Sequence, residues 1–265
     1  MPSHDRPPMT QSAHDLPRHG APAAYRPGDP VALFLPCYVD QLYPSVGQAV
    51  VTLFERLGIL LEYPEQQTCC GQPAFNSGYW EEARPVVRHF VRVFNPFRWI
   101  VVPSGSCAAM ARVFFGHLDS DSQVVETGRR VYELSDFLVN VLGVADTGAR
   151  FPHRITYHDS CHARRELGLL APPRRLMQAV RDATLCELPE VEECCGFGGT
   201  FSVKLAGTSL AMGRDKARHI LESGAEVVVS GDASCLMQIG GVLRRDPALR
   251  HIRTMHLAEL LVARE

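Results

Sequence analysis

Cysteines with a regular spacing are the residues of this sequence that point most directly to chemistry. Cys37 is followed after 31 residues by the run Cys69-Cys70-Gly71, and Cys107 comes 35 residues later. No Cys-x-x-Cys motif occurs in the chain, so any site must draw its thiols from three separated loops. Clustered thiols in a reducing compartment more often bind metal or carry out redox chemistry than form disulfides.

The same spacing occurs a second time. Cys161 is followed after 32 residues by Cys194-Cys195-Gly196, and 38 further residues separate this glycine from Cys235. Eight of the nine cysteines obey this pattern, which buried cysteines serving only as small apolar residues would not explain. The ninth, Cys186, lies outside the pattern, and we expect it to pack in the core.

The glycine after each cysteine pair has a structural reason. Successive side chains on an extended backbone point to opposite sides, so a turn is needed before both thiols can face one site. Glycine reaches positive φ without steric cost, and the N–H groups of such a loop can donate hydrogen bonds to sulfur. A cluster of several irons suits adjacent thiolates, and a zinc ion bound by four thiolates is the alternative.

The segments around the cysteines repeat as well. "WIVVPSGSC" (99–107) matches "EVVVSGDASC" (226–235), and "YELSDFLVNVLG" (132–143) matches "MHLAELLVA" (255–263). We therefore expect a first cysteine-rich domain at 31–150 and a second at 151–265. Residues 1–30, rich in proline and containing His4, His14 and His19, are expected to form a disordered tail.

Short apolar runs alternate with longer amphipathic stretches in both halves. The runs predict buried strands at 31–36, 59–63, 100–103, 155–157, 184–188 and 227–230. The amphipathic stretches predict helices at 46–57, 80–94, 172–181 and 209–223. This alternation predicts an α/β fold of two pseudo-symmetric halves, each with a small parallel sheet flanked by helices. The cysteine sites should then lie at the carboxyl ends of the strands.

Composition narrows the class of protein. The 265 residues carry a net charge of -2, which offers no basic surface for nucleic acid. No segment approaches the roughly 20 apolar residues of a membrane-spanning helix, and the N-terminus lacks the apolar core of a signal peptide. We expect a cytoplasmic globular protein with no transmembrane segment.

Two histidines and a glycine cluster lie close to the second set of cysteines. His158 and His162 flank Cys161, and either could ligate metal or carry protons. Because the first half has no histidine at the matching places, we favour local hydrogen bonding for both. The "GFGG" segment (196–199) is expected to wrap the site rather than bind phosphate.

Charged and aromatic residues near the cysteines are expected to have structural or surface roles. Arg164, Arg165 and Lys204 could bind a carboxylate, but solvent-exposed positions are the preferred interpretation. Tyr79 and Trp80 are expected to be core or interface aromatics at the start of a helix.

Several longer strings resemble a known family. The lone cysteine, the Cys-Cys-Gly run and the third cysteine resemble the CCG cysteine-rich domain of the heterodisulfide reductase B subunit and the glycolate oxidase iron-sulfur subunit. More closely, "CCGQPAFNSGY", "PSGSC", "VNVLGV", "CCGFGGTFSVK" and "SCLMQIGG" resemble the lactate utilisation protein A family, over about residues 31–264.

This resemblance implies a function and a ligand set. It implies an iron-sulfur oxidoreductase subunit that oxidises L-lactate to pyruvate with two partners, a ferredoxin-like iron-sulfur subunit and a third small subunit. The alternatives are an electron carrier of the heterodisulfide or glycolate oxidase type, or a zinc-bearing scaffold. It implies that the ligands of one 4Fe-4S cluster, cubane or non-cubane, are Cys37, Cys69, Cys70 and Cys107. Those of the other would be Cys161, Cys194, Cys195 and Cys235, with zinc an alternative in one half.

The sequence departs from the wider family at one place in each half. Where the heterodisulfide reductase type ends in Cys-x-x-Cys, this chain has Met110 and Gln238 in place of the last cysteine. The missing fifth cysteine argues against the five-cysteine, non-cubane cluster and against disulfide reduction, while the four remaining thiolates are enough for an ordinary four-iron cluster.

Overall fold

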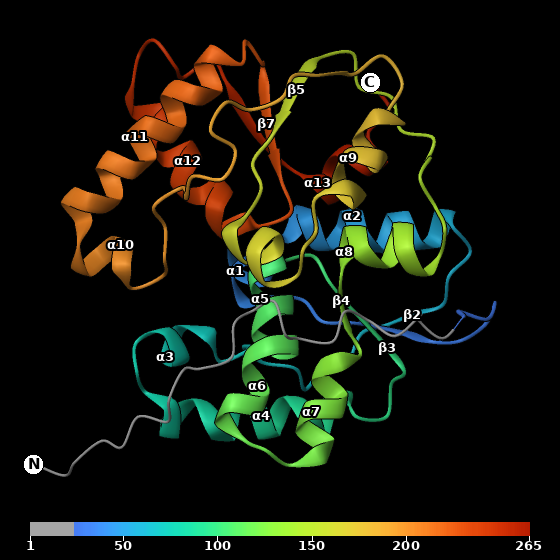
Figure 1. Ribbon diagram of the computed structural model, residues 1–265. Coiled ribbons are helices and arrows are strands. Elements are labelled where there is room, and N and C mark those ends of the chain that lie inside the picture. Colours follow the sequence, from blue (N-terminus) through green and yellow to red (C-terminus); the bar gives the residue numbers. More distant parts are fainter. Residues whose placement is uncertain (1–23) are drawn as a thin grey trace, which may run out of the picture.

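Two four-stranded parallel sheets form the framework of the computed structural model, which describes residues 24–265 (Figure 1). Across the first sheet, the strands follow the order β2 (Leu61–Glu62), β1 (Val31–Leu33), β3 (Trp99–Val102) and β4 (Val131–Glu133). The second sheet has the matching order β6 (Thr184–Leu185), β5 (Arg154–Tyr157), β7 (Val227–Ser230) and β8 (Arg253–His256). The expected α/β fold of two similar halves is confirmed.

Helices flank both sheets. Those of the first half are α1 (Cys37–Leu42), α2 (Pro44–Arg56), α3 (Gln72–Asn76), α4 (Trp80–Phe94), α5 (Gly105–Ala109), α6 (Phe115–Leu118), α7 (Ser122–Arg129) and α8 (Leu134–Asp136), with π-helical turns η2 (Met110–Phe114) and η3 (Phe137–Val141). Those of the second are α9 (Ala171–Gln178), α10 (Phe201–Lys204), α11 (Ala206–Glu222), α12 (Ala233–Arg245) and α13 (Leu257–Val262), with the π-helical turn η4 (His162–Glu166).

The strands and helices of the structure include all those expected from the sequence. All six expected strands and all four expected helices are present within a few residues of their predicted bounds. The structure adds β4 and β8, one strand at the end of each half, which the apolar runs had not indicated. Most of the expected tail (1–30), including its three histidines, lies outside the described residues.

Local sequence explains the main helices. Helix α2 begins at Pro44, where the fixed φ of proline suits the first turn and its missing N–H costs nothing. Helix α4 buries Ala83, Val87, Phe90 and Phe94, which recur at helical spacing and cover one side of the first sheet. Strands β3 and β7 are buried along their whole length, as expected for the inner strands of covered parallel sheets.

The strand order places a crevice at a defined point in each sheet. The chain leaves β1 for β2 on one side and then returns to β3 on the other, so β1 and β3 are neighbours whose connections run in opposite directions. Such switch points open a crevice beyond the carboxyl ends of the two strands. Cys37 follows β1 and Cys107 follows β3, while Cys161 and Cys235 follow β5 and β7, as predicted.

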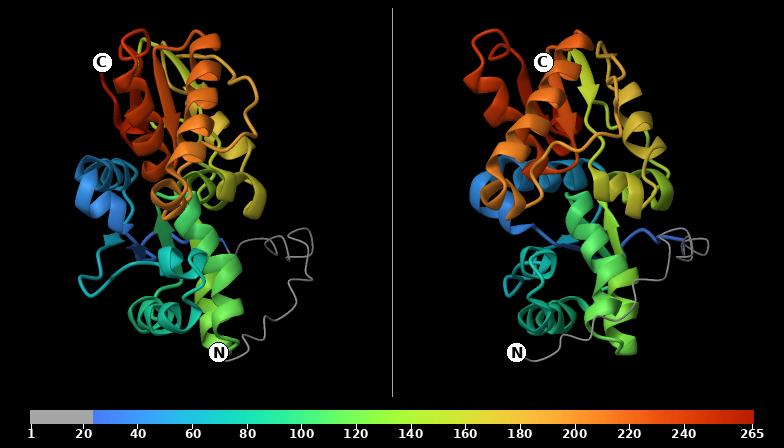
Figure 2. Two further views of the ribbon diagram at one scale, coloured as in Figure 1. Left: turned by 90° about the vertical axis from the view of Figure 1, so that its left-hand side faces the viewer. Right: turned by 60° about the vertical axis from the view of Figure 1, so that its left-hand side comes forward.

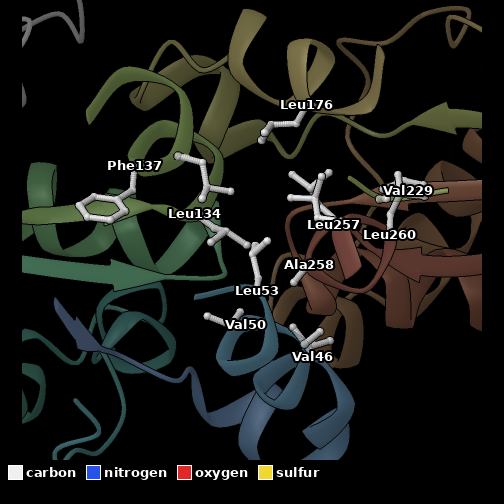
Figure 3. Packing of buried hydrophobic residues seen from close by; sticks show 14 of the residues in the cluster. Val46, Val50, Leu53, Leu134, Phe137, Leu176, Val229, Leu257, Ala258 and Leu260 are labelled. Carbon is white, nitrogen blue, oxygen red and sulfur yellow. The ribbon is translucent and has the colours of Figure 1, made fainter. Parts of the chain in front are cut away.

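The two halves share one hydrophobic core. Val46, Val50 and Leu53 of α2 face Leu257 and Ala258 of α13 in Figure 3. The same cluster continues to Leu134, Phe137, Leu176 and Val229 (Figure 3), and it also contains Val31 of the first sheet, so it includes residues of both sheets and of the helices between them. Burial on this scale holds the halves in one relative orientation.

In two matching places a helix of one half packs against helices of the other half. Helix α2 of the first half lies against α13 of the second, where Ser45 Oγ donates to Glu259 Oε1 at 2.8 Å and Arg56 donates to the Val262 carbonyl at 3.0 Å. In the corresponding contact, α9 of the second half packs on α8 and η3 of the first (Figures 1 and 2). Between residues 24 and 265, no helix is both long and apolar enough to span a bilayer.

Candidate metal centre

All eight patterned cysteines line one cavity between the two halves. The cavity is open to solvent, and the empty space within it and at its mouth together is about 850 Å³. Loops from the two halves meet beside it, because the Tyr38 and Phe197 rings lie edge to face at 5.6 Å and the hydroxyl oxygens of Ser77 and Thr200 are 3.0 Å apart. The fold therefore brings together the eight sulfurs that the sequence pattern singled out.

In the first site, the thiols lie close enough to contact one another. Cys37 Sγ is 3.8 Å from Cys69 Sγ, and Cys70 Sγ is 3.4 Å from Cys107 Sγ. Cys70 and Cys107 are buried, whereas Cys37 and Cys69 are partly exposed to the cavity. Gly71 has φ of 85° and its N–H donates to Cys69 Sγ at 3.4 Å, which is the role expected for the glycine.

The second site repeats this arrangement. Gly196 also has φ of 85°, and its N–H donates to Cys194 Sγ at 3.4 Å. Cys195 and Cys235 are buried while Cys161 and Cys194 are partly exposed, the same division as in the first site. A side chain at Gly196 would place Cβ 2.6 Å from the Ser209 carbonyl oxygen, so only glycine fits at this position.

Hydrogen bonds between the thiols lower the pKa of one cysteine in each site. Cys69 accepts hydrogen bonds from the thiols of Cys37 and Cys70, which lowers the pKa of Cys69 to about 3. The same contacts from Cys161 and Cys195 lower the pKa of Cys194 to about 2. In each site, hydrogen bonds from neighbouring thiols thus favour the thiolate form of one cysteine, and the thiolate is the form that binds metal.

A buried histidine distinguishes the second site from the first. His158 is 1% exposed, and neither of its ring nitrogens has a hydrogen-bond partner within residues 24–265. Leaving a buried polar group unpaired costs about 1–3 kcal/mol. Burial, with a smaller contribution from the charge of Lys216, lowers the pKa of His158 to about 3, so its ring is neutral. The expected local hydrogen bonding of His158 is therefore wrong.

His162, on the other side of Cys161, behaves more as expected. Its Nδ1 lies 3.6 Å from Cys161 Sγ, and its Nε2 lies 3.5 Å from Gln72 Nε2. Gln72 belongs to the first half and also donates to the Ser106 carbonyl at 3.1 Å. This histidine thus sits in polar contacts that link the second cysteine loop to the first half.

A buried carboxylate in the wall of the cavity joins the two halves. Asp232, which is 1% exposed, accepts from the Ser104 and Ser106 hydroxyls at 2.8 Å each and from the Ser106 N–H at 3.0 Å. Ser104 and Asp232 occupy matching positions, three residues before Cys107 and Cys235. Gly105 allows this approach, since a Cβ there would lie 2.5 Å from that of Ala163. The aligned "PSGSC" and "SGDASC" segments contain this pair, but no local signal marks their contact.

Among the remaining sequence candidates, the glycines and two of the three basic residues lie as predicted, and one basic residue does not. Gly198 and Gly199 line the cavity with the cysteines, as expected for a loop that wraps the site. Arg165 and Lys204 are exposed as predicted. Arg164 is not a solvated residue, because it is only 19% exposed and its guanidinium pairs with the buried Asp159 carboxylate at 3.0 Å.

The aromatic and cysteine expectations are met only in part. Tyr79 is 56% exposed and so is not a core residue, whereas Trp80 stacks on Phe75 with ring centroids 5.9 Å apart. Cys186 follows β6, does not line the cavity and is partly rather than fully buried.

Comparison with known proteins agrees with the repeated cysteine pattern. The cysteine-rich domain family (CCG) matches residues 31–112 and 155–240, one copy in each half. The chain is 48% identical to lactate utilization protein A of an Exiguobacterium species over 238 residues, covering 87% of this chain and 96% of that protein. The protein of the same name from a Geobacillus species is 44% identical, with 88% and 99% covered.

A solved structure gives a looser match. A putative Asp/Glu racemase from Yersinia pestis has a TM-score of 0.37 and 9% identity, with 88% of this chain and 95% of that one covered. The level of identity to the curated relatives and the two domain matches establish the relationship instead. This chain belongs to the lactate utilization protein A family and contains two CCG cysteine-rich domains.

Proposed function

We propose that this chain is an iron-sulfur oxidoreductase subunit of a cytoplasmic complex that oxidises L-lactate to pyruvate. The relatives carry lactate utilization in their names, which supports the substrate. We propose that the complex also contains a ferredoxin-like iron-sulfur subunit and a third small subunit. The observation on which the proposal depends is that two sets of four thiols, each from three separated loops, line one cavity.

The residues of each site fit an iron-sulfur cluster. Four cysteines supply the number of thiolates that a four-iron cluster takes from protein. The N–H groups of Gly71 and Gly196 donate to cysteine sulfur, and such hydrogen bonds stabilise the negative charge of a bound cluster. When bound, the clusters would accept electrons one at a time and pass them on.

The reaction itself sets a requirement on the subunit. Oxidation of lactate to pyruvate releases two electrons and two protons, so two one-electron centres in one chain could together store what one lactate provides. The described cavity lining includes no lysine or arginine that could bind the lactate carboxylate. We therefore assign electron storage and transfer to this cavity and place no substrate contact in it.

Metal analysis of the anaerobically purified protein tests this function. We expect iron and acid-labile sulfide in the protein, and a paramagnetic signal that appears or disappears on reduction with dithionite. Protein reconstituted with iron and sulfide that binds neither would contradict the proposal.

A zinc-bearing scaffold is the second candidate, and the sulfur spacing in the first site favours it. Two thiolates bound to one zinc at about 2.3 Å lie about 3.8 Å apart in a tetrahedral site. The Cys37 and Cys69 sulfurs are 3.8 Å apart. The same metal analysis separates the two functions, because a scaffold would contain zinc and no acid-labile sulfide.

A further inference from the structure

The second cysteine site contains a possible metal donor that the first lacks. We propose that His158 is a metal ligand of the second site, binding through a ring nitrogen beside the thiolates of Cys195 and Cys235. The first site would then be bound by thiolates alone. This inference rests on the proposed function only in requiring that a transition metal occupies the site, since thiolate and neutral imidazole donors suit both iron and zinc.

The geometry of the three side chains supports ligation. One ring nitrogen of His158 and the sulfurs of Cys195 and Cys235 all lie within 4.8 Å of one another, and all three residues are buried. The histidine backbone is fixed on both sides, because its N–H donates to the Val229 carbonyl at 2.8 Å and its own carbonyl accepts from Ser230 Oγ at 3.0 Å. The ring is therefore held at the site by the β5 and β7 framework.

The unpaired state of the ring points to a missing partner. Buried polar groups in folded proteins are nearly always hydrogen-bonded or bound to metal, and each exception requires an explanation. Both ring nitrogens of His158 are unpaired within the described part of the chain, although three cysteines of the site lie nearby. A metal at the thiolates would satisfy one of these nitrogens.

The first half provides an internal comparison. The residue three positions before Cys37 is Phe34, just as His158 lies three positions before Cys161. Phe34 is fully buried and packs edge to face on Phe90 and Phe94, with ring centroids 5.0 and 5.5 Å apart. A histidine is therefore not required by the backbone at this position, and an aromatic hydrocarbon ring fills the matching space in the first half.

A histidine ligand would make the two centres differ in redox behaviour. Where the neutral imidazole of His158 binds an iron in place of one thiolate, the centre carries less negative charge, and such a replacement raises the reduction potential of iron-sulfur centres. The buried ammonium of Lys216, near Cys194 and Cys195, acts in the same direction because positive charge favours the reduced form. We expect the second centre to be reduced before the first.

Pulsed electron paramagnetic resonance on the full-length protein tests ligation directly. The protein is labelled with 15N-histidine, loaded anaerobically with iron and sulfide, and partly reduced. We expect one of its signals to show a strong coupling to a single histidine nitrogen. If no signal of the fully loaded wild-type protein carries such a coupling, His158 is not a ligand and the proposal is overturned.

Three variants identify the histidine. His158→Phe copies the residue of the first half, and we expect it to abolish the nitrogen coupling while the other signal is unchanged. His162→Phe removes the other histidine beside Cys161, and His153→Phe removes one at the far end of β5 (Arg154–Tyr157). Both should retain the coupling. A coupling that survives in His158→Phe, or is lost only in His162→Phe, would contradict the proposal.

The experiment also separates this inference from the proposed function. If the protein takes up zinc and no sulfide, the redox function fails. Ligation by His158 is then tested in protein exchanged with Co²⁺, whose paramagnetic signal should show the same histidine coupling in the wild-type protein and lose it in His158→Phe. A Co²⁺ signal that is identical in both would overturn the ligand assignment.

Discussion

The two cysteine sites have matching thiols but different surroundings. At the end of β1 (Val31–Leu33) the first half carries Phe34 and Leu35, whereas at the end of β5 (Arg154–Tyr157) the second half carries His158 and Asp159. The strand order, the loop glycines and the burial of the sulfurs are alike in both. The backbone framework thus fixes where the thiols lie, while the residues just after the strands decide the polarity around them.

The largest effects are expected from the cysteines themselves. Cys70→Ser and Cys195→Ser remove matching buried thiols, and each should abolish the metal of its own half and leave that of the other half in place. Metal and sulfide content per chain, with the paramagnetic signals, measures this outcome. Cys186→Ser is the control and should leave the metal content unchanged.

This pair of variants also tests whether the sites are separate. Because all eight sulfurs line one cavity, loss of all metal in either single variant would show one shared centre instead of two. Unchanged iron in Cys195→Ser would show that the ligand assignment is wrong.

The next largest effect is expected on stability, when alanine replaces the glycine that follows each cysteine pair, Gly71 or Gly196. An alanine in the left-handed region costs about 1–2 kcal/mol at either position. At Gly196 the added Cβ would also lie 2.6 Å from the Ser209 carbonyl and 2.9 Å from Met212 Cβ, whereas at Gly71 its nearest neighbour is 3.6 Å away. Overpacking adds about 1–3 kcal/mol. Gly196→Ala should therefore lower the free energy of unfolding more than Gly71→Ala.

Urea unfolding of both glycine variants measures this difference. Equal losses of stability would show that the loop moves away from helix α11 at little cost. The close packing of the second loop would then not distinguish it from the first.

Sequence predicted the parts of this molecule that depend on local patterns. The six expected strands are apolar runs ended by turn residues, and the repeated spacing identified the cysteines that line the cavity. Strands β4 (Val131–Glu133) and β8 (Arg253–His256) were missed because they are short and include charged residues, so no apolar run marks them. Their pairing with β3 and β7 depends on the assembled sheets.

Contacts between the halves could not be predicted for a related reason. The bonds of Asp232 to Ser104 and Ser106 join residues more than 120 positions apart, and they form only when the shared core fixes the two sheets relative to each other. Similarly, the unpaired ring of His158 follows from what surrounds it in space. Only its position before Cys161 was visible in the sequence.

A smaller effect, dependent on pH, is expected from two matching helix caps. Glu133 caps α8 (Leu134–Asp136) and His256 caps α13 (Leu257–Val262), each as the last residue of its strand. Burial raises the pKa of Glu133 from 4.5 to about 7. Between these values the folded protein binds a proton that the unfolded chain has lost, so stability falls as pH rises, by on the order of 3 kcal/mol. Glu133→Gln should remove this fall.

His256, the matching residue of the second half, should change stability with pH in the opposite direction. Burial lowers the pKa of His256, so the unfolded chain binds a proton that the folded protein excludes once the pH drops below about 6.5. Because of His256, the free energy of unfolding should therefore decrease as the pH falls below about 6.5. Urea unfolding between pH 4.5 and 8 checks both signs, and a Glu133→Gln profile parallel to that of the wild-type protein would contradict the first.

The smallest effect we expect is at the carboxylate between the halves. In Asp232→Asn only one side-chain oxygen remains, so it cannot accept both from the Ser106 N–H, which now donates to Asp232 at 3.0 Å, and from the serine hydroxyls that the other carboxylate oxygen serves. Leaving a buried donor unpaired costs about 1–3 kcal/mol. Asp182→Asn is the matched control, because the Asp182 carboxylate pairs with Arg150 in solvent, where such pairs contribute about 0–1 kcal/mol. If urea unfolding gave equal losses for the two variants, the buried carboxylate would not help to hold the two cysteine sites together, and the shared hydrophobic core alone would set their relative position.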